Sequence, residues 1–439
     1  MTLLQSELST DQLLKAELKL LAEQGIDTDD LSKRVEAALA VGAVDERELE
    51  DLWAELESCA GLSSQSREPS DLAGILQMRP KRHPHPALKL GSDVLYDRIY
   101  GAWLGRCCGC TLGKPVEGWP RQKIEAYLRS AGSYPLSSYF PVRQPFLEGL
   151  ELKRPYPETT LGNVRYMTRD DDIDYTILNL QILKIYGSGF TSDQLATAVI
   201  TSLPFNLVYT AEAIAYRNVI NGMHPPRTAS FHNPFQEWIG AQIRADLWGY
   251  VNPGRLEKAA EMAWRDASYS HTRNGIYGEI WAAACIAAAF GTDNPREIVL
   301  AGLQQIPDSS RLAEAIRLSL EWVEELQEWE AVWDKIQAVY GSYSPLHVIP
   351  NTCLIVMGLV LGKGDLGTSI CTTVMGGNDT DCTGATVGSI VGAMRGSQAL
   401  AEEWTGPLQD RVKSLVPGFQ DGRISDLARE TAVLAEREA

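Results

Sequence analysis

A short acidic motif in the last quarter of the sequence has the residue types and the spacing of a cation site. Asp379 and Asp381 lie one residue apart within 376–382, which opens with two glycines and precedes a small, apolar stretch. That stretch predicts a buried helix, and the N-terminal end of a helix favours carboxylates and the cations that they hold. Acidic pairs in glycine turns are also common without any function, so the motif alone leaves both interpretations open.

A second acidic stretch favours the functional interpretation. Asp170, Asp171, Asp172 and Asp174 place four carboxylates in five residues, at the start of an apolar run over 177–183 that has helical spacing. Such acids can cap a helix, but four neighbouring carboxylates at the start of a buried helix repel one another. A bound cation would remove this repulsion. Oxygen ligands without a cysteine–histidine set favour Mg²⁺, Mn²⁺ or Ca²⁺ over zinc.

The elements that must position these acids carry two regular series of glycines. A glycine occurs at every fourth residue in 101–113 and again in 384–396. Glycine costs a helix interior roughly 1 kcal/mol relative to alanine, so each series indicates the close approach of another backbone. Small residues let helices cross closely, and we therefore expect these two helices to pack together. Glu117 follows the first series, after Pro115 ends the helix, and is expected on a loop beside the crossing.

The rest of the domain favours a mostly or wholly α-helical fold, because few stretches alternate as strands do. Residues 120–167 are rich in proline, glycine, tyrosine and serine, and we interpret them as a long surface excursion that would wall a cleft. Further helices are expected over 191–202, 210–220, 280–290, 398–408 and 424–438, with two over 308–340 and one that starts at 233–234.

The N-terminal residues are interpreted as a separate unit. Residues 1–78 predict a small helical appendage, 79–93 a basic linker broken by prolines, and 94–439 the large domain. The appendage carries apolar residues with helical spacing but no catalytic pattern. It would serve for docking or for self-association into a homo-oligomer, or it would pack passively against the domain.

Composition limits the functions that this chain can have. Of its 439 residues 44% are hydrophobic, which is enough for a large core, and the formal net charge is −17. This charge argues against nucleic acid or an anionic membrane as the main partner. The eight cysteines lack metal-finger spacing. There is no recognisable signal peptide, nor any apolar segment of the roughly 18 residues that a membrane helix needs. We expect a cytoplasmic protein with reduced cysteines.

Taken together, four segments resemble the ADP-ribosylglycohydrolase family. They are the first glycine series with the loop at 114–118, the acidic helix start at 170–172, the stretch 266–271 and the motif at 377–396. They follow the family's order, and the similarity covers about residues 94–435. The resemblance implies a compact, all-α domain of many helices around a cleft. It implies one or two Mg²⁺ ions in that cleft, with Mn²⁺ or Ca²⁺ as substitutes.

The resemblance also implies which residues hold the metal. The family's ligand positions fall here on Asp170, Asp171, Asp172, Asp379, Asp381 and Cys382. Asp170 replaces a threonine and still offers oxygen, whereas Cys382 replaces a threonine whose hydroxyl is a ligand. A soft sulfur suits Mg²⁺ poorly, so the second metal position is the less secure one. Thr168 gives an alternative register for the first motif, and Cys110 stands where many relatives have an aspartate.

The reaction implied is hydrolysis of a ribosidic bond, which would remove ADP-ribose from a modified protein or a small acceptor. Its transition state resembles an oxocarbenium ion, which nearby negative charge stabilises. A metal would bind the ribose hydroxyls and lower the pKa of a water. We expect Asp172 or Asp381 to take the proton of that water, and Glu117 to gate the cleft or to assist proton transfer.

Four further residues are expected to contact the substrate, namely Asp266, His271, Tyr175 and Trp119. Asp266 and His271 match a family loop near the substrate, while the rings of Tyr175 and Trp119 would stack on a base or ribose, or else pack in the core. Two alternative functions remain open. One is hydrolysis of a small N-riboside metabolite, and the other is a binding protein for ADP-ribose or a related ligand that has lost catalysis.

Overall fold

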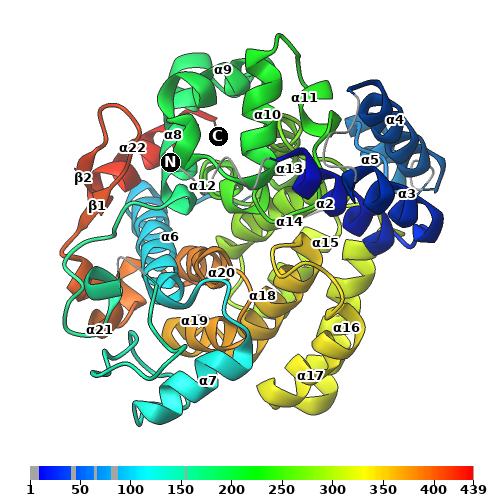
Figure 1. Cartoon of the computed structure of the whole chain (residues 1–439). Coiled ribbons are helices and arrows are strands. Elements are labelled where there is room, and N and C mark those ends of the chain that lie inside the picture. The colour runs from blue at the N-terminus through cyan, green and yellow to red at the C-terminus, as the bar shows by residue number, and fades with distance from the viewer. Residues whose placement is uncertain (1–8, 41–45, 64–66, 81–87, 154–155, 439) are drawn as a thin grey trace.

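The computed structural model describes residues 9–40, 46–63, 67–80, 88–153 and 156–438. Over these residues the fold is almost entirely helical, as Figure 1 shows. The described strands are two short ones, β1 (Arg411–Lys413) and β2 (Asp421–Arg423), which pair antiparallel. The predicted all-α fold is therefore confirmed.

Two long helices cross at the centre of the domain and bring its two ends together. They are α6 (Ser92–Gly113) and α20 (Thr380–Arg395), which lie side by side in antiparallel directions (Figure 1). A Cβ atom on Gly105 would collide with the backbone of Gly388, and one on Gly109 would collide with the backbone of Gly384. The close packing predicted for the two glycine series is confirmed.

The other long helices surround this pair. Their bounds are α7 (Arg121–Ser130), α8 (Asp171–Tyr186), α9 (Ser192–Ser202), α10 (Thr210–Ile220), α13 (Leu256–Ala267), α14 (Arg273–Ala289), α15 (Pro295–Leu303), α16 (Arg311–Leu326), α17 (Trp329–Tyr340), α18 (Val348–Gly362), α19 (Leu366–Met375) and α22 (Ile424–Glu438). Every residue of α14 is buried, which makes it the core helix of one half of the domain. Short helical segments connect these elements, namely η1 (Lys114–Val116), η2 (Tyr156–Thr159), η3 (Phe205–Leu207), α11 (Arg227–Ser230), η4 (Gln242–Arg244), α12 (Asp246–Tyr250), η5 (Ser397–Ala399), α21 (Glu402–Thr405) and η6 (Gly406–Leu408).

Three local expectations were wrong. The helix expected to start at 233–234 is a series of turns, since the Asn233 side chain accepts from the Phe235 N–H and donates to distant carbonyls. Residues 120–167 contain the helix α7 and several buried side chains, so they are not only a surface excursion. Residues 398–408 form three short helical segments instead of one helix, and Pro407 lies at the start of the last one.

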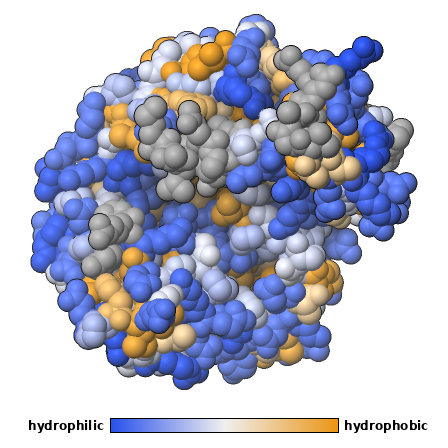
Figure 2. Space-filling view, viewed as in Figure 1, coloured by the Kyte–Doolittle hydropathy of each residue, from blue (hydrophilic) through white to orange (hydrophobic). Residues whose placement is uncertain are grey.

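The N-terminal helices pack on the side of the domain. They are α2 (Thr10–Glu23), α3 (Asp29–Ala40) and α4 (Glu46–Ser63), and their apolar side chains form a second core with Ala211, Ile214 and Phe235. Trp53 of α4 stacks on His232 with the ring centroids 4.3 Å apart. Figure 2 shows a mostly hydrophilic outer surface on these helices. The apolar face of the appendage is thus covered by the same chain.

The segment between the appendage and α6 also contacts the domain. It contains a helix that the sequence did not predict, α5 (Leu72–Met78), which begins where Asp71 accepts the Gly74 N–H at 2.8 Å. Residues 81–87 of the predicted linker lie outside the described residues. Among the helices that the structure describes, none is both long and apolar enough to cross a membrane.

Candidate metal centre

The acidic motif near the C-terminus forms a tight turn that leads into α20. Gly377 and Asn378 both have positive φ angles, of 80° and 64°. A Cβ atom on Gly377 would lie 2.6 Å from the carbonyl oxygen of Trp119, so this position requires glycine. Asn378 N–H donates to the Trp119 carbonyl at 3.2 Å, and Gly118 N–H donates to the Asn378 carbonyl at 2.8 Å. The turn is therefore attached to the loop that carries Glu117.

Two side chains from other helices hold the same turn. The amide oxygen of Asn351 accepts the Asp379 backbone N–H at 3.2 Å, and the indole N–H of Trp333 donates to the Gly376 carbonyl at 2.8 Å. These contacts place Asp379 at the N-cap of α20 and Asp381 in its first turn. Sequence analysis assigned no role to Asn351, because nothing in its local pattern reveals a partner so distant along the chain.

Asp170 caps the other acidic helix, α8, and is held by a lysine. Its Oδ1 accepts the Asp172 backbone N–H at 3.1 Å, and its Oδ2 accepts from the Lys114 ammonium at 2.5 Å. Lys114 also donates to the Arg169 carbonyl. The Arg169 side chain itself points to Asp174, at 2.7 Å. Both carboxylate oxygens of Asp170 are thus used within the protein.

A fully buried arginine of α6 holds Asp172. The Arg106 guanidinium donates to the Asp172 carbonyl at 2.5 Å, to Asp172 Oδ1 at 3.2 Å and to Asp246 Oδ2 at 2.7 Å. The second carboxylate oxygen of Asp172, Oδ2, is buried and has no hydrogen-bond partner. Sequence analysis missed Arg106 and Asp246. A charged residue inside a glycine-faced, apolar helix is a signal that would have found the arginine.

The acids of both motifs meet between the first turns of α8 and α20. The potential ligand atoms form three groups, and within each group one ligand atom from every residue lies within 4.8 Å of the others. The groups are Cys110–Asp170–Asp172, Asp172–Asp381–Cys382 and Glu117–Asp379–Asp381. Oδ1 of Asp381, like Oδ2 of Asp172, is buried without a partner. Asp171 is partly exposed and belongs to none of the three groups. Buried polar atoms are normally paired, so the two free oxygens are available to a ligand such as a metal ion.

Burial and mutual repulsion raise the pKa of most of these carboxyls. Burial, and then the charge of Glu117, raises the pKa of Asp379 to about 7. The same two causes raise the pKa of Asp381 well above its usual value. Burial also raises the pKa of Asp172, although Arg106 opposes it. Asp170 is the exception, because the Lys114 ammonium outweighs burial and lowers the pKa of its carboxyl.

The donor set fits a hard divalent cation at most positions. Carboxylate oxygens are the preferred ligands of Mg²⁺, and the group of Glu117, Asp379 and Asp381 offers oxygens alone. Cys382 fits less well, because burial and then the charge of Asp172 raise the pKa of its thiol well above the usual value. A protonated thiol is a weak ligand. The residues present therefore suit Mg²⁺ or Mn²⁺ best on the side of Glu117.

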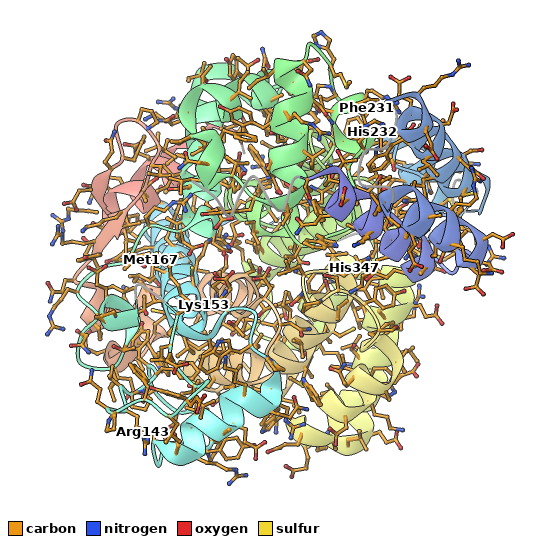
Figure 3. All side chains as sticks on the ribbon, viewed as in Figure 1. Arg143, Lys153, Met167, Phe231, His232 and His347 are labelled. Atoms are coloured by element: carbon orange, nitrogen blue, oxygen red, sulfur yellow. The ribbon has the colours of Figure 1, made fainter. Side chains whose placement is uncertain are left out.

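Glu117 lies at the solvent edge of the centre. Its carboxylate is 3.5 Å from the Lys153 ammonium, and the two side chains are 40% and 46% exposed, respectively. In Figure 3 Lys153 is labelled where it lies over α6. Since the neighbouring acids Asp379 and Asp381 are buried, Glu117 provides a contact between the centre and the solvent.

Two of the predicted substrate contacts are buried and have unused polar atoms. The Tyr175 hydroxyl, one turn after Asp171 on α8, has no partner, and neither has Nε2 of His271. His271 Nδ1 lies 2.8 Å from the Ser270 hydroxyl. Burial, together with the charge of Arg244, lowers the pKa of His271 well below its usual value, so its ring is neutral. Each residue offers one polar atom that a bound molecule or a water would satisfy.

The other two predicted contacts are engaged within the protein. Asp266 lies at the end of α13 and not on a loop, and its oxygens accept from Arg244 at 2.7 Å and from Asn179 at 2.8 Å. The Trp119 ring packs edge-on against Tyr127 of α7, with the centroids 6.1 Å apart. The structure thus brings the carboxylates of both motifs together, but it surrounds these two side chains with other parts of the core.

Comparisons with known proteins relate this chain to one family. One solved structure, described as an ADP-ribosylglycohydrolase-related protein complex, is similar over 79% of this chain and 99% of that chain, with 18% sequence identity and a TM-score of 0.45. The comparison with curated proteins gives no match. The family model described as ADP-ribosylglycohydrolase matches residues 91–438, a range that includes both acidic motifs and both glycine series. This chain therefore belongs to the ADP-ribosylglycohydrolase family.

Proposed function

We propose that this chain is a metal-dependent hydrolase that cleaves a ribosidic bond and removes ADP-ribose from a modified protein or a small acceptor. Membership of the family supports a glycohydrolase of the ADP-ribose type. The observation that carries the proposal is the pair of buried, unpartnered oxygens, Asp172 Oδ2 and Asp381 Oδ1, where the two acidic motifs meet.

The proposed metal ligands are Asp171, Asp172, Asp379, Asp381 and Cys382. Asp170, the sixth residue of the predicted set, would bind a metal only where Lys114 does not hold its carboxylate. When bound, Mg²⁺ would orient the ribose hydroxyls and lower the pKa of a water. The oxygen donors support Mg²⁺, with Mn²⁺ or Ca²⁺ as substitutes, because carboxylate ligands suit all three ions.

The chain's own carboxylates have two tasks in the proposed reaction. Their negative charge stabilises the oxocarbenium-like transition state, and Asp172 or Asp381 accepts the proton of the attacking water. Glu117, at the solvent edge, gates access or passes the proton outwards.

The residues around the carboxylates are proposed to bind or position the substrate. Tyr175 and His271 would contact it through the free hydroxyl and the free Nε2. Asp266 would act indirectly, since it holds Arg244, whose guanidinium carbon lies 5.5 Å from the Tyr175 ring centre. Trp119 would act through its backbone carbonyl, which supports the metal-binding turn.

The test is release of ribose or ADP-ribose from ADP-ribosyl-arginine, an ADP-ribosylated protein and free nucleosides. Wild type and Asp381→Asn are compared with and without chelator, and Asp426→Asn, on the exposed side of α22, serves as the matched control. We expect chelator and Asp381→Asn each to lower release by roughly 10²–10⁴-fold, while Asp426→Asn matches wild type. Undiminished release in both conditions would show that the carboxylate site is not the catalytic one.

The same panel decides between substrate classes. Turnover of nucleosides without turnover of ADP-ribosyl conjugates would assign the chain to hydrolysis of a small N-riboside. The absence of nucleic-acid and membrane partners, a cytoplasmic location and self-association through α2–α4 remain predictions from the sequence.

A binding protein without catalysis is the second candidate, and Cys110 and Cys382 favour it. Both thiols lie within the groups of potential metal ligands. Burial raises the pKa of each well above its usual value. Such a protein would bind ADP-ribose in a calorimeter and leave every conjugate intact in the presence of Mg²⁺ or Mn²⁺.

A further inference from the structure

Lys114 has no task in the proposed reaction, yet its ammonium lies inside the metal centre. Its Nζ is 2.5 Å from Asp170 Oδ2, and its side chain is only 13% exposed. We propose that Lys114 is a tethered cation that permanently fills one of three cation positions, so that divalent ions exchange only at the two positions built around Asp381. This inference rests on the proposed function, and it concerns which positions of the centre are open.

The hydrogen bonds of the carboxylates distinguish the three positions. In the group Cys110–Asp170–Asp172 both oxygens of Asp170 are used, one by the Asp172 N–H and the other by Lys114. The groups Asp172–Asp381–Cys382 and Glu117–Asp379–Asp381 share Asp381, and its Oδ1 is free. The free Oδ2 belongs to Asp172, which the first and the second group share. The acid that distinguishes the first group is therefore Asp170, whose oxygens are both used, whereas the acid common to the other two groups, Asp381, keeps a free oxygen. The two positions around Asp381 are the ones that a divalent ion can enter.

The net charge of the metal centre also indicates two divalent ions and not three. Among the described residues, the centre and its immediate partners contribute eight carboxylates, from Glu117, Asp170, Asp171, Asp172, Asp174, Asp379, Asp381 and Asp246. Four cations face them, from Lys114, Arg106, Lys153 and Arg169. Four negative charges remain, which two divalent ions neutralise and a third would exceed. Lysine suits the role because its ammonium is a compact point charge on a long stem.

Counting bound Mn²⁺ on the full chain tests the inference without any activity assay. Lys114→Met removes the charge and keeps a chain of similar length, while Lys114→Arg keeps the charge. We expect Lys114→Met to bind one Mn²⁺ more than wild type by equilibrium dialysis, and Lys114→Arg to bind the same number as wild type. An unchanged count in Lys114→Met overturns the inference alone. Wild type that binds no Mn²⁺ refutes the proposed function together with the inference.

Absorption spectra with Co²⁺ test the inference in a chain that keeps Lys114. This second test therefore does not depend on the folding of Lys114→Met. A thiolate bound to Co²⁺ gives a charge-transfer band in the near ultraviolet. Because Lys114 separates the ions from Cys110, Cys110→Ser is expected to leave the Co²⁺ spectrum of the otherwise wild-type chain unchanged. In Lys114→Met the band is expected to grow, and adding Cys110→Ser is expected to abolish that growth. A spectrum that loses intensity with Cys110→Ser while Lys114 is present would overturn the inference.

Discussion

Two buried ionic clusters of this protein differ in how their charges are balanced. Around Glu237, the guanidinium groups of Arg311 and Arg273 lie 2.5 Å and 3.0 Å from the carboxylate, and Arg311 also binds Glu68 at 2.8 Å. The metal centre, in contrast, has more carboxylates than cations, and it leaves oxygens of Asp172 and Asp381 without partners. The first cluster joins the N-terminal segment to the domain and needs nothing else. The second is incomplete without a ligand.

The pKa values of Glu237 and Asp381, one carboxyl from each cluster, reflect this difference in charge balance. Burial raises the pKa of Glu237, but Arg311 and then Arg273 outweigh it, so that the pKa is lowered. Burial and the charge of Glu117 act together on Asp381 and raise its pKa. Both side chains are buried, so the neighbours decide the direction. A buried acid alone does not identify a functional site, whereas several buried acids with too few counter-charges mark a candidate for one.

The largest effect is expected from breaking the balanced cluster. Arg311→Met leaves Glu237 and Glu68 buried without their cation, and we expect it to lower the free energy of unfolding by about 3–5 kcal/mol. Urea denaturation followed by circular dichroism measures this loss. Arg317→Met, on the same helix, removes an exposed ion pair with Asp308 and is expected to cost less than about 1 kcal/mol. Similar losses in both variants would refute the importance of the cluster.

The second-largest effect is expected when a divalent ion binds to the metal centre. Mg²⁺ or Mn²⁺ at a hundred times its dissociation constant is expected to raise the free energy of unfolding by about 2.7 kcal/mol. Asp381→Asn is expected to lose this increment, whereas Asp426→Asn, which alters an exposed carboxylate of α22, is expected to retain it. Thermal unfolding at several metal concentrations measures the increment. Stabilisation of Asp381→Asn equal to that of wild type would place the ion elsewhere.

A third prediction concerns Glu17, a buried carboxyl near the balanced cluster, whose counter-charge Arg273 also binds Glu237. Burial raises the pKa of Glu17 from 4.5 to about 7, although the charge of Arg273 opposes it. A pKa that is raised in the folded state stabilises the protein below pH 4.5, and this stabilisation is lost as the pH rises through about 7. Glu17→Gln is expected to remove a pH-dependent change on the order of 2 kcal/mol. Urea denaturation of both proteins between pH 4.5 and pH 8 would reveal it, and parallel curves would contradict it.

The smallest expected effect distinguishes an acid that neighbouring carboxylates repel from an acid that is paired with a cation. In the presence of chelator, Asp381→Asn removes one of several like charges and is expected to raise the free energy of unfolding by about 1 kcal/mol. Asp174→Asn is the matched variant, because Asp174 is a buried acid that is paired with Arg169 at 2.7 Å, and we expect it to be destabilised. Urea denaturation compares the two. Destabilisation of both to the same extent would mean that the metal-free centre carries no excess of negative charge.

The helical class and the crossing of α6 and α20 follow from the amino-acid sequence alone. Helical spacing of apolar residues identifies most of the long helices, because a buried helix requires that spacing wherever it lies in the fold. The glycines at every fourth residue of 101–113 and 384–396 predict the contact between α6 and α20, since only a neighbouring backbone explains them. The two acidic motifs can also be recognised in the sequence. Clustered carboxylates at the start of a buried helix repel one another, so they indicate a bound partner.

Which carboxylate oxygens of the two acidic motifs lack a hydrogen-bond partner depends on contacts between remote segments, and so on the tertiary structure. Lys114 and Arg106 are distant in sequence from the acids that they bind, and so is Asn351, which holds the turn at Asp379. Asp266 likewise looked available for substrate until Arg244 was found on its carboxylate. Local patterns report what a residue can do, whereas hydrogen bonds between remote segments consume particular oxygens. The availability of a ligand atom is therefore a property of the fold.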